Sequence, residues 1–325
     1  MCRETLDSLP GGWQFHENES AVSKGSSKLT TAAEDFSVVP AFEVRSAAEQ
    51  RVPFVFSSPH SGRYYPERFL AMSRLDGRDV RRSEDCYVDE LFGGCVSLGA
   101  PLLAANFPRA YLDANREPWE LDPRMFAEPV PPYCNIRSAR VAGGLGTVPR
   151  LVGEGFDIYA GRLPLAEAVT RIEKVYKPYH ETLKRLLSQT RAGFGFAILV
   201  DCHSMPAGVR VSDSGLRPDF IIGDRFGTSA ASSLSATAID LLCAMGYTVA
   251  HNKPYAGGFI TEYYGRPPRK VHALQIEINR GLYMNERTLE KTAGFDALAE
   301  DITRFCADLM ALSDHHFRAP PLAAE

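Results

Sequence analysis

Short apolar runs alternate with longer amphipathic segments along most of this chain, and this alternation predicts its secondary structure. Runs rich in Val, Ile, Leu and Phe that end in turn-forming residues are typical of buried strands. The expected strands are residues 52–57, 101–105, 197–201, 219–223, 247–251 and 273–279.

The clearest helix is expected over residues 164–191, where apolar residues recur at steps of three and four. This spacing gathers them on one face of a helix. Pro178 lies inside this segment and is expected to kink or divide it, because proline has no backbone N–H to donate. Further helices are expected over residues 84–98, 229–245 and 287–313.

Strands that alternate with helices indicate an α/β sheet with helices on both faces. Residues 114–155 interrupt the alternation with many prolines and glycines, and a loop of this length is usually functional, so we expect a lid or a substrate-binding segment there. Residues 1–40 show little periodicity and are expected to form a weakly structured arm. Residues 41–325 are expected to form a single α/β domain.

The composition narrows the class of protein. The chain has 325 residues, of which 45% are hydrophobic and 23% charged, as in ordinary globular proteins. No apolar run approaches the ~20 residues of a membrane helix, and the first residues lack the features of a secretory signal. Seven cysteines without a CxxC pair argue against a disulfide framework and a thiolate zinc site, and favour the reducing cytoplasm. A net charge of −4 without basic clusters argues against nucleic acid as a partner.

Two histidines stand where predicted strands end. His60 follows the strand 52–57 within the run SSPHSG, and His203 follows the strand 197–201 within LVDCHSMP. Loops at the carboxyl edge of an α/β sheet converge on ligands. Imidazole is a usual zinc ligand, and catalytic zinc takes three protein ligands and a water molecule. The two histidines are therefore predicted to be two of the three protein ligands of a metal site. The alternative is that both are hydrogen-bonded loop histidines.

A third ligand is expected to be a carboxylate or a histidine at a strand or helix end. The run RSEDCYVDEL offers Glu84, Asp85 and Asp89, with Ser83 as the expected cap of the helix 84–98. Acidic residues in the first turn of a helix also match its dipole without any metal. The sequence pattern leaves these three carboxylates as alternatives.

Four further residues have the chemistry that a metal hydrolase needs. Glu277 lies between Ile276 and Ile278 in the strand 273–279, and a buried carboxylate is costly unless it is paired or functional. A raised pKa in such a place suits proton transfer. Arg109, Asn115 and Arg116 could hold an acidic substrate, because a guanidinium matches a carboxylate in bidentate geometry. The alternatives are a Glu–Arg ion pair and ordinary structural arginines.

Six dispersed motifs give the chain a family resemblance. The runs SSPHSG, EDCYVDELF, NFPRAYLDANREP, LVDCHSMP, GGFITEYYG and LQIEINRGLYMNE occur in this order. Together they resemble the N-formylglutamate amidohydrolases, which are related to zinc carboxypeptidases and aspartoacylase, and the resemblance covers residues 50–290. It implies a zinc hydrolase with a carboxypeptidase-like α/β fold, in which helices flank a mixed central sheet.

The resemblance also assigns roles to residues. It implies that His60, Asp85 and His203 bind zinc, with Glu84 as a rival to Asp85. The related carboxypeptidases carry a ligand glutamate three residues after the first histidine, where this chain has Arg63.

For catalysis, the resemblance implies that Glu277 is the catalytic glutamate and that Arg109 polarises the scissile carbonyl. Asn115 and Arg116 match a pair that grips the substrate carboxylate. Gly257 and Gly258, with Tyr263 and Tyr264, are expected to form a closing loop.

The expected function is zinc-dependent hydrolysis of N-formyl-L-glutamate, a small acidic substrate, to formate and L-glutamate. One alternative is a broader N-acyl-amino-acid amidase or a carboxypeptidase-like peptidase that uses the same zinc chemistry. Another is a non-catalytic protein that binds an acidic ligand without a metal.

Overall fold

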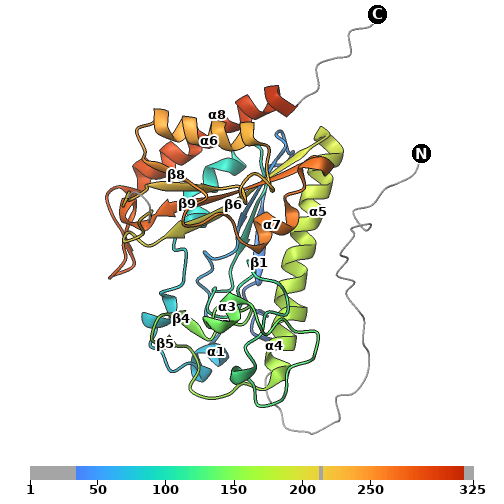
Figure 1. Ribbon diagram of the computed structural model, residues 1–325, viewed down its shortest axis with the longest axis vertical. Coiled ribbons are helices and arrows are strands. Elements are labelled where there is room, and N and C mark those ends of the chain that lie inside the picture. Colours follow the sequence, from blue (N-terminus) through green and yellow to red (C-terminus); the bar gives the residue numbers. More distant parts are fainter. Residues whose placement is uncertain (1–33, 212–214, 318–325) are drawn as a thin grey trace, which may run out of the picture.

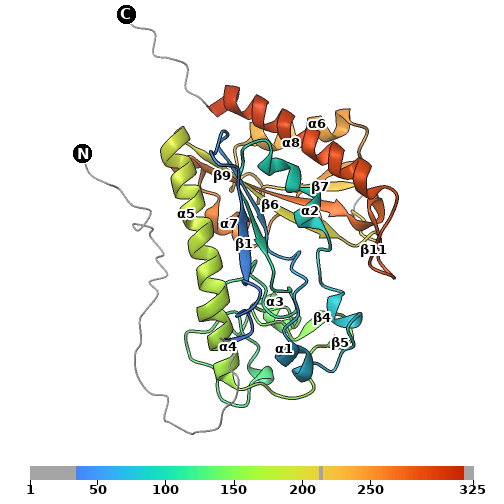
Figure 2. The ribbon, with the colours of Figure 1, turned by 180° about the vertical axis from the view of Figure 1, so that it is seen from behind.

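A mixed seven-stranded sheet forms the centre of the computed structural model, which describes residues 34–211 and 215–317 (Figures 1 and 2). The sheet confirms the expected α/β class. In spatial order its strands are β1 (Phe42–Arg45), β3 (Leu102–Ala105), β2 (Phe54–Ser58), β6 (Ala197–Met205), β9 (Val271–Asn279), β7 (Phe220–Gly223) and β8 (Val249–His251). Strands β3, β2, β6 and β9 are parallel to one another, whereas β1 and β7 run antiparallel to their neighbours β3 and β9.

All six predicted strands are present, and β6 is longer than its sequence pattern indicates. It continues through the polar residues beyond Asp201 because it stays paired with β9 as far as Met205 opposite Asn279. His203 therefore lies within the strand and not in the loop after it. The sequence analysis missed the edge strand β1, whose residues are half-buried or exposed.

The sheet separates two hydrophobic cores because successive side chains of a strand point to opposite faces. Val55 and Leu199 belong to the core beneath helix α5 (Lys177–Phe194), and Phe56 and Val200 belong to the other. Helices α6 (Ser232–Ala244) and α8 (Phe295–Phe317) cover the second core. Figures 1 and 2 show α5 on one side of the sheet and these two helices on the other. Helices thus flank both faces, as expected.

The predicted helix 164–191 is present as three consecutive segments. Helix α4 (Leu165–Arg171) passes into a π-helical turn, η5 (Ile172–Tyr176), and then into α5. Pro178 has no N–H to donate, and the extra residue of a π turn is a common way to accommodate such a break. The predicted kink or division is thus present as a π-helical turn that ends just before Lys177 and Pro178.

The prediction of a helix over residues 84–98 is wrong. Only α2 (Val88–Leu91) and the 3-10 turn η3 (Gly93–Val96) form there. Gly94 packs so closely on α8 that an added Cβ would lie 2.1 Å from Thr303. Tyr87, in the left-handed region at φ 65°, precedes α2, so Ser83 does not cap it. Residues 84–86 consequently lie on irregular chain, where adjacent side chains can point in different directions.

The last predicted helix begins later than expected. Helix α8 starts at Phe295, and residues before it form the hairpin of β10 (Met284–Asn285) and β11 (Glu290–Lys291). The Asn285 side chain accepts hydrogen bonds from the backbone N–H groups of Arg287 and Thr288. This turn chemistry competes with a helix.

Residues 114–155 form mostly loops with three short elements, η4 (Pro123–Met125), α3 (Ala139–Ala142) and β4 (Leu151–Gly153), which pairs with β5 (Phe156–Asp157). The remaining elements are α1 (Glu67–Met72), η2 (Asp79–Arg81), α7 (Phe259–Tyr264), η6 (Pro267–Arg269) and η7 (Arg280–Leu282). Tyr263 and Tyr264, expected in a closing loop, belong to helix α7.

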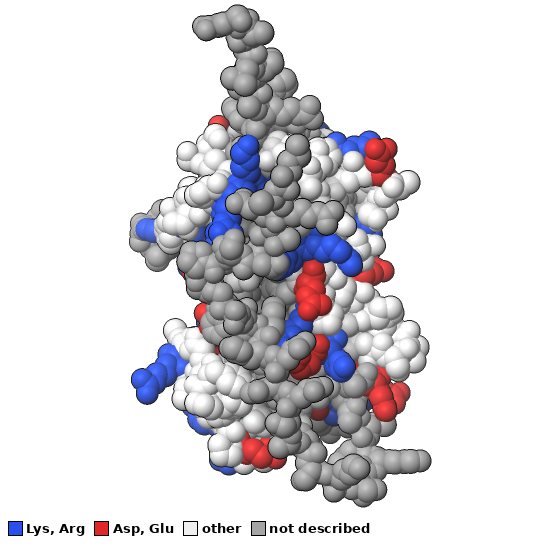
Figure 3. Space-filling view, turned by 90° about the vertical axis from the view of Figure 1, so that its right-hand side faces the viewer, with Lys and Arg blue, Asp and Glu red and all other residues white. Residues whose placement is uncertain are grey.

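The expected N-terminal arm lies mostly outside the described residues. Of the part that is described, Asp35 is buried and accepts hydrogen bonds from Arg68 and from the Tyr111 hydroxyl. On the face drawn in Figure 3, basic and acidic side chains are interspersed. Within residues 34–211 and 215–317, no helix combines the length and apolar character needed to cross a bilayer.

Candidate metal centre and active site

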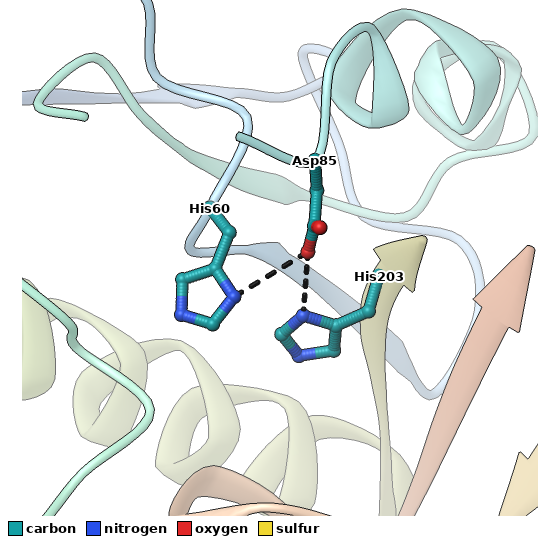
Figure 4. A group of neighbouring side chains, drawn as sticks. All are labelled: His60, Asp85 and His203. Atoms are coloured by element: carbon teal, nitrogen blue, oxygen red, sulfur yellow. Dashed lines mark hydrogen bonds and ion pairs between the residues drawn. The ribbon is translucent and has the colours of Figure 1, made fainter. Parts of the chain in front are cut away.

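Three of the predicted ligands meet at one point, although they lie far apart in the sequence. His60 follows β2, Asp85 precedes α2 and His203 lies near the end of β6 (Figure 4). One ligand atom from each lies within 4.8 Å of the others, and all three residues are buried. The carboxyl ends of the parallel strands β2 and β6 thus present two imidazoles to one carboxylate.

The His60 ring is oriented so that one nitrogen is left for a metal. Its Nε2 lies 2.7 Å from Asp113 Oδ1, which fixes the proton on Nε2. The buried Nδ1 has no hydrogen-bond partner in the described part of the chain and faces Asp85 Oδ2 at 3.4 Å. A buried polar atom without a partner costs about 1–3 kcal/mol, and a cation bound to the Nδ1 lone pair would remove this cost.

His203 has the same orientation. Its Nδ1 lies 3.0 Å from Asp85 Oδ2, and its Nε2 lies 3.0 Å from Asp201 Oδ2. Burial lowers the pKa of His203, but the charge of Asp201 and the hydrogen bonds to Asp201 and Asp85 outweigh it and raise this pKa well above the usual value. A carboxylate behind each ligand histidine is the usual outer layer of a metal site.

The two carboxylate oxygens of the third residue, Asp85, have different surroundings. Oδ2 faces both histidines, while Oδ1 accepts hydrogen bonds from Ser204 Oγ at 3.2 Å and from Arg280 Nη2 at 2.9 Å. Burial raises its pKa, but the histidines and Arg280 overcome this effect and hold the pKa well below the usual value. Two nitrogens and one charged oxygen fit the three-ligand set of a catalytic zinc ion.

The rival carboxylate Glu84 points elsewhere. It accepts hydrogen bonds from the Tyr65 hydroxyl at 2.6 Å and from Arg81 Nε at 2.9 Å. Arg63, at the position of the carboxypeptidase ligand glutamate, forms ion pairs with Asp89 and Glu90. Of the acidic residues 84, 85 and 89, the structure brings only Asp85 to the two histidines.

Glu277 lies beside the metal group in the sheet. It is opposite His203 in the pairing of β6 with β9 and is 8% exposed. Burial raises the pKa of its carboxyl to about 7, and Asp85 adds to this effect whereas His203 opposes it. Within the described residues no arginine forms an ion pair with Glu277, which excludes the predicted alternative of a Glu–Arg pair there. Its Oε1 accepts a hydrogen bond from Gln275 Nε2 at 2.8 Å.

The two arginines of the site share one carboxylate. Arg109 donates from Nε to Asp113 Oδ2 at 3.0 Å, and its two terminal nitrogens form no hydrogen bond with the described residues. Arg116 donates to the carbonyl oxygens of Leu145 and Asn115, which leaves Nη2 at 3.3 Å from Asp113 Oδ2. Both guanidinium groups therefore keep donors for a substrate oxygen.

Asn115 is held by protein contacts at both ends of its amide. Its Nδ2 lies 3.2 Å from Asp201 Oδ2 and 3.1 Å from His203 Nε2, and its Oδ1 accepts from the backbone N–H of Ile260. The expected contact between Asn115 and a substrate carboxylate stays a prediction.

The sequence analysis missed four residues that hold the site, namely Asp113, Asp201, Ser204 and Arg280. Asp201 had a usable signal, because residues two apart in a strand share a face and Asp201 precedes His203 by two. Asp113 had no such signal, since it lies in a loop and meets His60 only through the fold.

The carboxylate behind His203 gives a test of the metal centre. We expect Asp201→Asn to weaken zinc binding about 10–100-fold, because the neutral amide no longer raises the basicity of the imidazole. Zinc affinity is measured by competition with a chelating indicator. Asp224→Asn is the matched control, since Asp224 is also buried and lies 3.0 Å from a histidine Nε2, that of His251. Equal affinity in the Asp201 variant and the control would contradict the ligand role of His203.

Comparisons with known proteins agree with the resemblance seen in the sequence. The family model described as N-formylglutamate amidohydrolase matches residues 52–284. N-formylglutamate deformylase of Pseudomonas aeruginosa is 32% identical over 249 residues, which cover 75% of this chain and 87% of that protein. The deformylase of Pseudomonas putida is 29% identical over 248 residues, covering 75% and 86%.

Solved structures extend the similarity to the fold. The crystal structure of N-formylglutamate amidohydrolase from Ralstonia eutropha has a TM-score of 0.79 and 34% identity, covering 84% of this chain and 99% of that one. A protein of Agrobacterium tumefaciens shares the fold at 19% identity and a TM-score of 0.57, covering 84% and 96%. Because the family model spans most of the chain and a relative exceeds 30% identity over three quarters of it, the chain belongs to the N-formylglutamate amidohydrolase family and is an amidohydrolase.

Proposed function

We propose that the protein hydrolyses N-formyl-L-glutamate to formate and L-glutamate, with zinc held by His60, Asp85 and His203. The names of the similar proteins support the substrate. The observation that carries the proposal is the buried group of two inward-facing imidazole nitrogens and one carboxylate oxygen. Opposite His203 in the sheet lies Glu277, a carboxyl that forms no ion pair with the described residues.

The donor set fits zinc, because the unpartnered Nδ1 of His60 and the Oδ2 of Asp85 face the same point. When bound, zinc supplies a Lewis acid that polarises the formyl oxygen and lowers the pKa of water. Asp113 and Asp201 keep the two imidazoles in the tautomer that presents Nδ1. Ser204 and Arg280 keep the Asp85 carboxylate turned toward the histidines.

Glu277 acts as the general base and then as the general acid. Its carboxylate takes a proton from the water that attacks the formyl carbon, so that a C–O bond forms. It then delivers this proton to the amide nitrogen as the C–N bond breaks, and the leaving group departs as the neutral amine. A carboxyl with a pKa near 7 suits both steps, because it exchanges protons readily at neutral pH.

The arginines interact with the substrate oxygens. The terminal nitrogens of Arg109 donate to the carbonyl oxygen, where negative charge develops in the transition state. Arg116 Nη2 holds the substrate α-carboxylate, and two backbone carbonyl oxygens keep its guanidinium in place. To Asn115 we assign a positioning role, because its amide already contacts Asp201, which holds His203.

The substrate role of Arg116 leads to a prediction on binding. We expect Arg116→Ala to raise KM for N-formyl-glutamate about 10–100-fold, the effect of losing one charge-assisted hydrogen bond. The increase in KM should be smaller for the substrate analogue in which an amide replaces the α-carboxylate. Arg304→Ala is the control, because this exposed arginine of α8 pairs with Asp301 on the same helix. Equal KM increases for both substrates would contradict a contact between Arg116 and the α-carboxylate.

The proposed function is tested by metal analysis and a substrate panel. We expect about one zinc ion per chain, as in a mononuclear three-ligand site, and turnover of N-formyl-glutamate well above that of N-acetyl-glutamate or a dipeptide. Comparable turnover of all three would favour the broader amidase or the peptidase. Protein that binds glutamate derivatives but holds no zinc and turns over none of them would favour the non-catalytic binding protein.

A further inference from the structure

Two polar pairs lie side by side on the face of the sheet that carries the metal group. Asp201 is opposite Gln275, and His203 is opposite Glu277, in the pairing of β6 with β9. In the proposed function Asp201, His203 and Glu277 have roles, and Gln275 has none. Gln275 is nonetheless 5% exposed, and a buried amide is costly unless its hydrogen bonds are made.

Gln275 makes both kinds of hydrogen bond that its amide allows. Its Oε1 accepts from the backbone N–H of Gly258 at 2.7 Å, and its Nε2 donates to Glu277 Oε1 at 2.8 Å. A backbone N–H can only donate, so the Gln275 oxygen must face Gly258. The amide NH2 therefore faces Glu277, and the orientation of the amide is determined by its surroundings.

The backbone at Gly258 is fixed by close packing against Asn115. A Cβ added to Gly258 would lie 2.4 Å from Asn115 Nδ2, so the backbone there packs directly on the Asn115 amide. Two residues further on, the N–H of Ile260 donates to Asn115 Oδ1. Asn115 thus connects the start of α7 to Asp201 and His203. Gln275 connects it to Glu277.

We propose that Gln275 is a positioning residue that holds the Glu277 carboxylate in the orientation for proton transfer. The inference rests on the proposed function. Donation from Nε2 engages Oε1 of Glu277 and leaves Oε2 for the proton. A neutral donor can do this without neutralising the base, whereas an arginine would form an ion pair with it. A displacement of about 1 Å in a catalytic group can cost on the order of a hundredfold in rate.

The alternative role for Gln275 is to attach the loop before α7 to the sheet. The two roles differ in a double-mutant cycle, because a residue that acts through Glu277 has nothing to position once the base is gone. Gln275→Met keeps the size of the side chain and removes both hydrogen bonds. Gln275→Asn keeps the amide but is one methylene too short to reach both Gly258 and Glu277. It replaces Gln275→Met in the experiment if the methionine variant does not fold.

The experiment measures zinc content, kcat and KM for N-formyl-glutamate in each Gln275 variant, alone and combined with Glu277→Gln. We expect normal zinc, a kcat about 10–100-fold lower in the single variant with KM nearly unchanged, and no further loss in the combined variant. Gln50→Met is the matched control, because Gln50 is likewise a hydrogen-bonded glutamine, whose Nε2 donates to the carbonyl oxygens of Val52 and Phe54, but it lies before β2, away from the site.

Two outcomes would overturn the inference. One is a normal kcat in the Gln275 variants while Glu277→Gln is impaired. The other is the same fractional loss in both backgrounds, which would assign Gln275 to the loop attachment. Failure of the proposed function is distinguishable, because it would appear as wild-type kcat in Glu277→Gln or as absence of turnover in the unmodified protein.

Discussion

His203→Ala is expected to abolish both stoichiometric zinc binding and turnover. The substitution removes one of three ligands and leaves Asp85 with one imidazole neighbour in place of two. A catalytic zinc site normally has three protein ligands, and two do not hold the ion firmly. Zinc content is measured by elemental analysis after dialysis, and turnover by release of formate from N-formyl-glutamate.

A second buried histidine provides the control for this substitution. His272 lies near the start of β9, opposite Ile198, and its Nδ1 accepts a hydrogen bond from the backbone N–H of Ala231. It is 6% exposed, against 3% for His203, so both replacements remove a buried imidazole. We expect His272→Ala to keep its zinc. Normal zinc content in His203→Ala would refute the ligand role of His203.

Glu277→Gln is expected to keep zinc and the fold but to lose at least about a hundredfold in kcat. General acid–base catalysis contributes ~10²–10⁴-fold, and the amide has the size of the carboxyl without its basicity. KM should change far less, because the substrate contacts assigned to Arg109 and Arg116 remain. The measurement is steady-state kinetics on zinc-replete protein.

Glu120→Gln is the matched control for the loss of a buried carboxyl. Glu120 is 2% exposed and accepts a hydrogen bond from the backbone N–H of Glu117, outside the metal group. We expect its kcat to stay within about twofold of the wild-type value, because within the described part of the chain its carboxyl bonds to the Glu117 N–H and Arg140 and to none of the residues assigned to zinc or proton transfer. A wild-type kcat in Glu277→Gln would exclude Glu277 as the base and direct the search to another carboxyl near the metal.

The strands could be predicted because their signal is local. Residues 54–56 and 220–222, within β2 and β7, are buried on both faces, so these runs are apolar throughout and stand out in the sequence. The edge strand β1 lacks this signal, because its residues are half-buried or exposed. The helix predicted over 84–98 failed because Gly94 is required by the close approach of α8, a contact that no local pattern reveals.

Among the site residues too, some have a local signal in the sequence and others do not. His203 was predicted from its place where an apolar strand ends, and Glu277 from its place between apolar strand residues, because burying such a carboxylate is costly without a partner or a function. The choice between Glu84 and Asp85 could not be made from their spacing, since adjacent residues on irregular chain point in directions set by their partners. Arg81 and Tyr65 hold Glu84, and Arg280 and Ser204 hold Asp85.

The sequence by itself determined the α/β class, the interruption of the long helix near Pro178, the family and the two strand-end histidines. These depend on periodicity, on strand ends and on motifs, all of which are readable along the chain. Only the tertiary structure decided which carboxylate meets the histidines, which nitrogen each imidazole presents, and which amide faces Glu277. Such hydrogen bonds join residues as distant as His60 and Asp113 or Gly258 and Gln275, and their partners exist only once the sheet has brought the strand ends together.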